Sequence, residues 1–261
     1  MFANLGYQYS EDTILSFYGR SDKHKTTGFS PTYKVNLSKF INKFKFGITH
    51  STGLRNPSLY ELYGSSSSHS GSTGIDPEKS STNELYAEYK FSENLKFIST
   101  FYRTHMTDRI KIKSDWSGYE NKLTDTTQEG IESEIGLSFK NDQKISIMSH
   151  FAKNRTDTGG PNSRRPDLSY GIDYEKKIDF KKLGPLDLNL NYRYIGDHLD
   201  WTGSKNEFVK SVNLVDLQIR KKILGSIFSL SFTNLLNERY EKPATYSQDG
   251  RELRFGVKYL Y

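Results

Sequence analysis

The sequence predicts an all-β fold, an antiparallel transmembrane β-barrel with about thirteen strands in this chain. Apolar and polar residues alternate along many segments, these segments run to roughly ten residues, and short connections alternate with long ones. Tilted strands of ~9–11 residues cross a bilayer, with side chains alternating between lipid and a wet lumen. A closed barrel also pairs every backbone polar group, which a bilayer demands.

The alternation defines each strand in turn. In residues 186–194, LDLNLNYRY, every second residue is leucine or tyrosine, and aspartate, asparagine or arginine lies between them. Residues 168–175 and 252–259 repeat this pattern. Because successive side chains of a strand point to opposite faces, each segment has one apolar and one polar face. The predicted strands lie near residues 2–9, 13–22, 28–37, 43–52, 82–91, 95–112, 126–140, 144–153, 167–176, 186–196, 211–221, 226–235 and 252–261.

The connections fall into two classes that alternate along the chain. The short ones are 10–12, 38–43, 92–94, 141–143 and 222–225, and the long ones are 53–81, 113–125, 154–166, 197–210 and 236–251. Residues 23–27 are a short member of the long class, and residues 177–185 are a stretched member of the short class. If the C-terminus is periplasmic, every long connection becomes an outer loop and every short one a periplasmic turn.

Composition agrees with a barrel and excludes several other classes. A mean hydropathy of −0.72 is expected when only alternate residues meet lipid, and the 18 tyrosines and 16 phenylalanines suit interfacial girdles. The absence of cysteine removes disulfides, thiolate metal sites and cysteine nucleophiles. The net charge of +6 is dispersed, without a basic stripe or a binding motif, so we expect no nucleic-acid partner. No apolar run approaches the ~18 residues of a spanning helix, and no signal-peptide pattern is visible.

The sequence gives no sign of catalysis, of a cofactor or of a metal site. The polar candidates include six histidines without a ligand spacing, the lumen-facing pair Glu132 and Glu134, and the acidic residues Asp76 and Glu78. The segment SSSSHSGSTG, 65–74, lacks the lysine of a phosphate loop and is interpreted as a mobile tip of an outer loop. We therefore predict no catalytic residue, no cofactor, no metal and no enzyme activity. The histidines are His24, His50, His69, His105, His150 and His198.

Aromatic residues of the outer loops and upper lumen wall are the candidate ligand contacts. Their rings offer a large contact area to an amphipathic ligand and lose little side-chain conformational entropy on binding. Some of them are alternatively girdle residues at the membrane surface. The candidates are Tyr60, Tyr63, Trp116, Tyr119, Trp201 and Tyr246.

Five segments, in the family's order, resemble TonB-dependent outer-membrane receptors. Residues 232–261 resemble the closing segment of these receptors, in which an Asn-Leu-Leu-Asn…Tyr loop leads through Gly-Arg into a last strand with a terminal aromatic residue. The Arg-Arg-Pro passage and the spacing are most similar to the cobalamin transporter branch. The other four segments are STGLRNPSLYELYG (51–64), DPEKSSTNELYAEYK (76–90), YENKLTDTTQEGIESEI (119–135) and RRPDLSYGIDY (164–174).

The resemblance implies a barrel of about 22 strands that holds a plug domain and is energised by TonB–ExbB–ExbD. Residues 1–261 would then be the C-terminal barrel portion, without plug or signal peptide, in the bacterial outer membrane. The implied ligand is cobalamin or a ferric siderophore. Arg55, Arg109, Arg164 and Arg165 would pair with acidic groups of the plug or of the loops.

The last strand resembles the β-signal read by the barrel assembly machinery. Its apolar residues would serve insertion and contact with outer-membrane lipid, and the alternative is an ordinary edge strand. These residues are Leu253, Phe255, Val257, Tyr259 and Tyr261.

Two other readings stay open. A complete passive porin of about 12 or 14 strands predicts that no plug is encoded upstream and that the isolated chain conducts ions. A soluble β-rich binding or adhesion protein predicts a chain that stays monodisperse without detergent. The apolar row Leu186, Leu188 and Leu190 argues against the soluble protein, unless a second sheet covers it.

Overall fold

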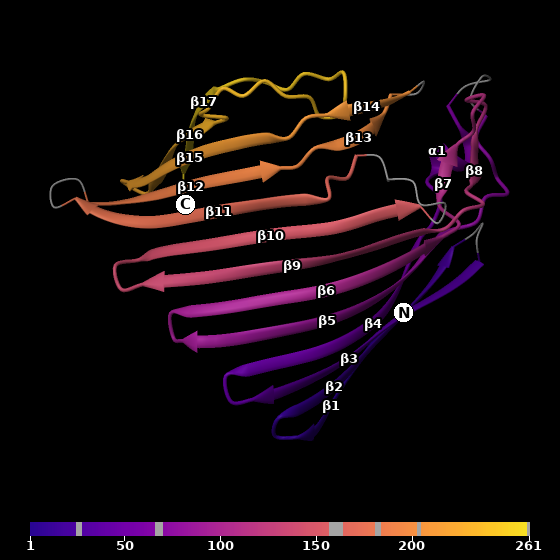
Figure 1. The fold of residues 1–261 in the computed structure, drawn as a ribbon, viewed down its shortest axis with the longest axis horizontal. Helices are drawn as coiled ribbons and strands as arrows, with labels where there is room; N and C mark the ends of the chain where they lie inside the picture. The colour runs from indigo at the N-terminus through magenta and orange to yellow at the C-terminus, as the bar shows by residue number, and fades with distance from the viewer. Residues whose placement is uncertain (25–27, 66–69, 157–163, 181–183, 203–204, 260–261) are drawn as a thin grey trace. The chain divides into compact units, whose positions relative to one another are not determined.

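The computed structural model describes residues 1–24, 28–65, 70–156, 164–180, 184–202 and 205–259 (Figure 1). The chain divides into two compact units. The first comprises Met1–Ala87, Thr100–Gly130 and Lys153–Pro161. The second comprises Glu88–Ser99, Ile131–Ala152 and Asn162–Tyr261.

Within the described residues, thirteen strands form one sheet in which neighbours in the chain are also neighbours in space. The sheet is antiparallel, so the predicted fold class and the number of strands are confirmed. The strands are β1 (Phe2–Ser10), β2 (Thr13–His24), β3 (Gly28–Ile41), β4 (Phe44–Arg55), β5 (Glu78–Ser92), β6 (Leu95–Thr107), β9 (Thr126–Phe139), β10 (Gln143–Thr156), β11 (Leu168–Phe180), β12 (Gly184–Ile195), β15 (Val212–Ile223), β16 (Ser226–Thr233) and β17 (Glu252–Tyr259).

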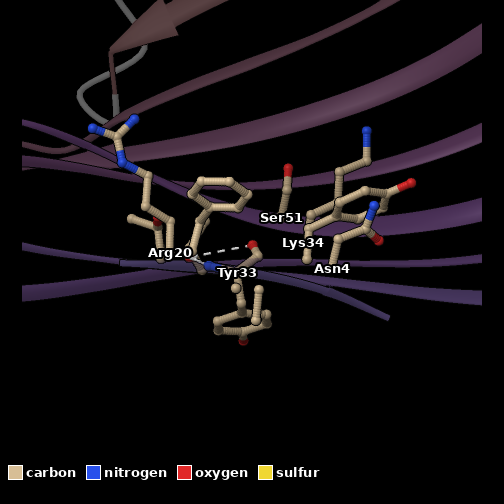
Figure 2. A pocket seen from close by; sticks show the side chains of 11 residues that line it. Asn4, Arg20, Tyr33, Lys34 and Ser51 are labelled. Atoms are coloured by element: carbon tan, nitrogen blue, oxygen red, sulfur yellow. Dashed lines mark hydrogen bonds between the residues drawn. The ribbon is translucent and has the colours of Figure 1, made fainter. Parts of the chain in front are cut away.

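In the first unit, the strand register places apolar residues opposite apolar residues and polar residues opposite polar ones. Phe17 lies opposite Val35, and Leu37 opposite Ile48, on one face, whereas Asn36 lies opposite Thr49 on the other. The Asn36 amide donates to the Thr49 hydroxyl at 2.9 Å. Figure 2 shows the same alternation, because the side chains of Arg20, Lys34 and Ser51 project from one side of these strands and Tyr33 from the other. The sheet therefore has one apolar and one polar side.

The second unit carries the same division across β11 to β17. Ile172 lies opposite Tyr192, Leu190 opposite Leu217, and Leu230 opposite Phe255, which builds a continuous apolar side. Asp173, Asn191 and Asp216 follow one another across the opposite, polar side. Ile172, Leu190 and Phe255 are exposed, with Phe255 at 70% relative exposure, and their partners Tyr192, Leu217 and Leu230 are half-buried. An apolar side of this extent requires an apolar environment.

The turns at one end of the strands are tight, as the short connections predict. Asn42 (φ 52°) and Asp142 (φ 51°) adopt left-handed backbone conformations in two of them. Leu224 (φ 47°) and Gly225 (φ 77°) form a two-residue turn with both φ angles positive, which matches the twist of a β-hairpin. Among the described residues, no helix is long and apolar enough to cross a membrane.

The opposite ends of the strands carry ordered secondary structure that the sequence analysis did not predict. The helix α1 (Leu59–Tyr63) lies in the first long loop. The strands β7 (Ile110–Ile112) and β8 (Tyr119–Asn121) form one hairpin, and β13 (His198–Trp201) and β14 (Asn206–Val209) form another. The hairpins lie outside the thirteen-stranded sheet.

Two expected boundaries were wrong. The segment 95–112 is not one strand, because Asp108 takes a φ of 54° and the chain leaves the sheet between β6 and β7. Several strands are also longer than expected, and β5 begins at Glu78 rather than near residue 82. The added residues extend the sheet toward the long loops, which gives those loops a rigid base.

Candidate functional site in the outer loops

The first long loop folds onto a short capped helix. Ser58 and Glu61 form a reciprocal capping box, in which the Glu61 N–H donates to the Ser58 hydroxyl and the Ser58 N–H donates to the Glu61 carboxylate at 2.7 Å. Such a box satisfies N–H groups that a helix start leaves without partners. Gly64 ends the helix with a φ of 67°, and Leu62 is buried beneath it.

An arginine joins this helix to the sheet. Arg55 donates both terminal nitrogens to Glu61, at 3.0 and 3.1 Å, and its Nε to Glu78 at 2.7 Å. Glu78 also accepts the N–H of Ile110 at 2.8 Å, so the ends of β4, β5 and β7 meet at this ion pair. Partial burial alone would raise the pKa of Glu61, but the hydrogen bonds from Arg55 and Ser58 lower it below its ordinary value.

The hairpin β7–β8 packs on the same loop. Asn121 accepts the N–H of Asp76 at 2.8 Å and donates its amide to the carbonyl groups of Asp76 and Asp108. Gly71 and Gly118 permit the close approach, because a Cβ on Gly118 would lie 2.8 Å from the Gly71 carbonyl oxygen. Residues 70–74 of the predicted loop tip are therefore held by hydrogen bonds, such as that from the Ser72 N–H to the Glu61 carbonyl group. Residues 66–69, with His69, lie outside the described part.

Four of the six predicted ligand residues belong to this loop assembly. The rings of Tyr60 and Tyr119 meet edge to face, with centroids 6.1 Å apart. Tyr63 is exposed on α1, and Trp116 is 58% exposed in the tip of the β7–β8 hairpin. The structure thus brings Tyr60 and Tyr119 together and places Tyr63 and Trp116 on the same folded loops. Their role in ligand binding stays a prediction.

The outer loops of the second unit are joined at a buried carboxylate. The side chain of Asp200 in β13 is 1% exposed. It accepts Nε of Arg164 at 2.5 Å and the N–H of Ala244 at 2.8 Å. Three loops that are distant in sequence therefore share one hydrogen-bonded residue. The apolar residues buried in this unit include Ala152, Val209, Val212, Leu214 and Ala244.

An asparagine side chain holds the last outer loop together by hydrogen bonds. Asn234 is buried, with a φ of 51°, and its amide donates to the carbonyl groups of Glu238 and Asp249 while its oxygen accepts the Glu238 N–H. Its own N–H donates to Asp216 on the polar side of β15. The predicted ligand residue Tyr246 is exposed on this loop. Trp201 ends β13, and its side chain lies outside the described part.

Of the arginines predicted to pair with acidic groups, two contact a carboxylate and a third contacts a hydroxyl group. Arg55 and Arg164 do so within the loops, which confirms the prediction for these two residues. Arg109 donates to the hydroxyl of the buried Thr126 at 3.2 Å. Glu78, one of the two acidic candidates of the sequence analysis, accepts hydrogen bonds from Arg55 and from the N–H of Ile110. The described residues contain no cluster of three His, Cys, Asp or Glu side chains arranged for a metal ion.

The sequence analysis missed the residues that organise the loops. Glu61, Asp200 and Asn234 each hold two or more segments together, and none was singled out. Two of the three had a visible signal: Ser58 and Glu61 have the spacing of a capping box, and Asn234 opens the Asn-Leu-Leu-Asn…Tyr motif. For Asp200 the partners lie 36 and 44 residues away, and no local pattern marks such contacts.

The apolar residues of the terminal strand that the structure describes lie on the exposed side of β17. Leu253, Phe255, Val257 and Tyr259 are exposed and pair in order with Phe232, Leu230, Phe228 and Ser226 of β16. Tyr261 lies outside the described residues. Recognition of this strand by the assembly machinery stays a prediction.

A recess of about 440 Å³ lies on the polar side of β1 to β4 (Figure 2). Arg20 and Lys34 contribute its cationic groups, and Asn4 and Ser51 contribute polar ones. Arg20 is paired with Asp22 at 2.6 Å. None of the aromatic residues predicted to bind ligand lines this recess.

Long antiparallel strands with an exposed apolar side, a polar side and folded loops at one end define a β-barrel of the outer-membrane class. The chain matches the family described as TonB dependent receptor-like, beta-barrel, over residues 1–237. It therefore belongs to the TonB-dependent receptor-like β-barrel family and is a protein of the bacterial outer membrane.

Solved structures with the same fold include two siderophore receptors and an iron transporter. The siderophore receptor PirA from Acinetobacter baumannii superposes with a TM-score of 0.79 at 16% identity, over 99% of this chain and 45% of that one. The ferric enterobactin receptor PfeA from Pseudomonas aeruginosa gives 0.76 at 18% identity, over 98% and 44%. The FrpB iron transporter from Neisseria meningitidis gives 0.74 at 14% identity, over 99% and 44%. This chain spans less than half the length of each.

Proposed function

We propose that the barrel and loops of this chain bind a ferric siderophore at the cell surface and admit it in a TonB-dependent step. The observation that carries the proposal is membership of the receptor family, combined with folded outer loops that display aromatic residues. The iron-related receptors of the same fold favour a ferric siderophore over the cobalamin suggested by the sequence motifs. The role is transport without catalysis.

The partners follow from the same proposal. A plug domain would fill the lumen, the TonB–ExbB–ExbD complex would supply energy, and the barrel assembly machinery would insert the strands into outer-membrane lipid. The polar side of the sheet supports a lumen that is wet and able to face a polar plug. For example, Gln218 donates to Ser231 across neighbouring strands of this side.

Rigid loops support the binding step. Arg55 and Asp200 fix the loops of their own units before any ligand arrives, so less conformational freedom is lost on binding. Aromatic residues then offer large contact surfaces with few rotatable bonds. We propose that Tyr60, Tyr63, Trp116 and Tyr119 form one such contact surface and that Tyr246 belongs to another.

Uptake measurements in the source bacterium test the proposal. The native gene is deleted, and iron-limited cells are given ferric enterobactin, ferric citrate, ferrichrome or cyanocobalamin in labelled form. We expect uptake of at least one ferric complex to fall in the deletion strain and in a strain depleted of TonB, while cyanocobalamin uptake is unchanged.

Three outcomes would contradict it. Loss of cyanocobalamin uptake alone would assign the chain to cobalamin transport. Uptake that depends on the gene but not on TonB, together with ion conductance in planar bilayers, would indicate a passive porin. Unchanged uptake of all four compounds would remove the support for a ferric ligand.

A further inference from the structure

The last outer loop of the second unit contains a recess of about 520 Å³, within the size range of small-molecule sites. Its walls come from the two arms of the loop, residues 237–241 and 247–250. The arms are tied together by the bonds from the Gln248 N–H to the Tyr240 carbonyl group and from the Lys242 N–H to the Tyr246 carbonyl group.

The walls of the recess are held in place by hydrogen bonds between side chains and backbone groups of the same loop. Asn237 accepts the N–H of Arg251 at 3.0 Å, and Gln248 donates to the carbonyl groups of Lys242 and Tyr246. Asn234 braces the base of the loop, and Asp200 holds Ala244 near its tip. These bonds define the walls, and a preformed site loses less conformational entropy when it binds.

One strong donor in this wall has no partner among the described residues. The exposed guanidinium of Arg239 makes no hydrogen bond or ion pair with any part of the chain that the structure describes. By contrast, Arg251 of the same loop donates to the Leu235 carbonyl group. The one acidic residue lining the recess, Glu241, accepts the N–H of Thr245 at 2.7 Å.

The remaining lining groups suit an anionic oxygen beside an aromatic ring. The hydroxyl of Ser247 and the amide nitrogen of Asn237 are further donors, because Asn237 uses its oxygen for Arg251. Tyr240 contributes a half-buried ring. Guanidinium groups bind carboxylates, catecholates and similar paired oxygens in a bidentate geometry.

We propose that this recess, with Arg239 as its main contact, binds a carboxylate or catecholate group of an anionic ligand. The inference deepens the proposed function, because a ferric siderophore with such groups is the ligand expected at the outer loops. The anion site itself depends only on the geometry of residues 237–250 and not on iron.

The first experiment uses the anion without iron. Outer membranes from cells that carry the native gene are treated with phenylglyoxal in the presence of free citrate or free 2,3-dihydroxybenzoate, and the modified arginines are identified by mass spectrometry. We expect the anion to slow modification of Arg239 about fivefold or more and to leave Arg251 unchanged. Equal modification of Arg239 with and without either anion would overturn the inference.

The second experiment compares variants of the native gene in uptake of ferric enterobactin and ferric citrate. Arg239→Ala should weaken the apparent affinity for the transported complex about tenfold, and Arg239→Lys should recover part of it. Lys242→Ala is the matched control, because it removes the same charge from the same loop but does not line the recess. Equal losses in Arg239→Ala and Lys242→Ala would reduce the effect to net charge and contradict a specific site.

The two experiments separate the two proposals. Protection of Arg239 by free anions, without any gene-dependent uptake of a ferric complex, would retain the anion site and reject the ferric siderophore. Gene-dependent ferric uptake with an unprotected Arg239 would retain the proposed function and reject the recess as its contact.

Discussion

Arg164 donates its Nε to the carboxylate of Asp200 at 2.5 Å, and Asp200 is almost completely removed from solvent while Arg164 is 61% exposed. The second oxygen of the same carboxylate accepts the Ala244 N–H. One buried residue therefore fixes the positions of two other loops. A surface ion pair alone would contribute little, but a buried acceptor that satisfies a backbone N–H cannot be removed without leaving that donor unpaired.

Asp200→Ala should loosen these loops while leaving the strands intact. The loss of two hydrogen bonds to a buried acceptor should cost about 2 kcal/mol of local stability. Hydrogen exchange measured by mass spectrometry should rise in peptides that contain residues 164, 199–200 and 244, and stay unchanged in β15 and β16. Glu207→Gln is the control, because it breaks the exposed Lys205–Glu207 pair in the same hairpin. Similar exchange in both variants would contradict a special role for Asp200.

The ion pair of Glu61 predicts a pH dependence of the loop that contains α1. The folded-state pKa of Glu61 lies below its ordinary value of 4.5, so its contribution to stability is present above that value and is lost as the pH falls through the folded-state pKa. The protection of residues 58–64 against hydrogen exchange, expressed relative to the intrinsic exchange rate at each pH, should therefore fall as the pH drops below 4.5.

Two variants distinguish this effect from general acid unfolding. Glu61→Gln should remove most of the pH dependence and show faster exchange at neutral pH, because the bidentate contact with Arg55 is lost. Glu120→Gln serves as the control, since its pair with Lys111 is exposed and should contribute little. Persistence of the same acid response in Glu61→Gln would show that another group controls it.

Gly71→Ala should push residues 70–72 away from the end of α1 and, because the Gly71 carbonyl group lies against Gly118, loosen their contact with the β7–β8 hairpin. A Cβ at this position would lie 2.5 Å from the Gly64 nitrogen and 2.6 Å from the Leu62 carbonyl carbon, and the φ of +74° disfavours any other residue. The expected cost is about 1–3 kcal/mol. It should appear as faster exchange in residues 58–64 and 117–119. Gly74→Ala is the matched control, because nothing lies within 4 Å of its added Cβ. Equal behaviour of the two variants would be inconsistent with the close packing.

The strands were predictable because their pattern is local. The alternation of apolar and polar residues from Leu186 to Tyr194 is enough to assign each side chain to one face of the strand. In the folded sheet, Leu190 then lies opposite Leu217 on the apolar face. The same rule failed at residue 108, because Ile110 and Ile112 continue the alternation beyond the residue where the chain turns away. The pattern of apolar residues carries no information about the left-handed conformation of Asp108.

The loops were less predictable because their contacts join distant segments. Asp200 meets Arg164 and Ala244, and Gly71 meets Gly118, across sequence separations that no local pattern encodes. The presence of aromatic residues in these loops could be predicted from the sequence, since Tyr60 and Trp116 lie in long connections. That Tyr60 meets Tyr119 depends on the folded loop and was not deduced.

Trp116→Ala tests the proposed aromatic contact surface. The indole is 58% exposed at the tip of its hairpin, and a large ring that packs on a ligand there should contribute about 1–2 kcal/mol to binding. We therefore expect a roughly tenfold rise in the concentration of ferric complex needed for half-maximal uptake, with an unchanged maximal rate, because Trp116 would act in capture rather than in translocation. Leu123→Ala is the control, since Leu123 is a fully exposed apolar residue that follows the same hairpin. If Trp116→Ala lowered only the maximal rate, the ring would serve a later step; if both variants behaved like the wild type, the contact surface would have to lie elsewhere in the loops.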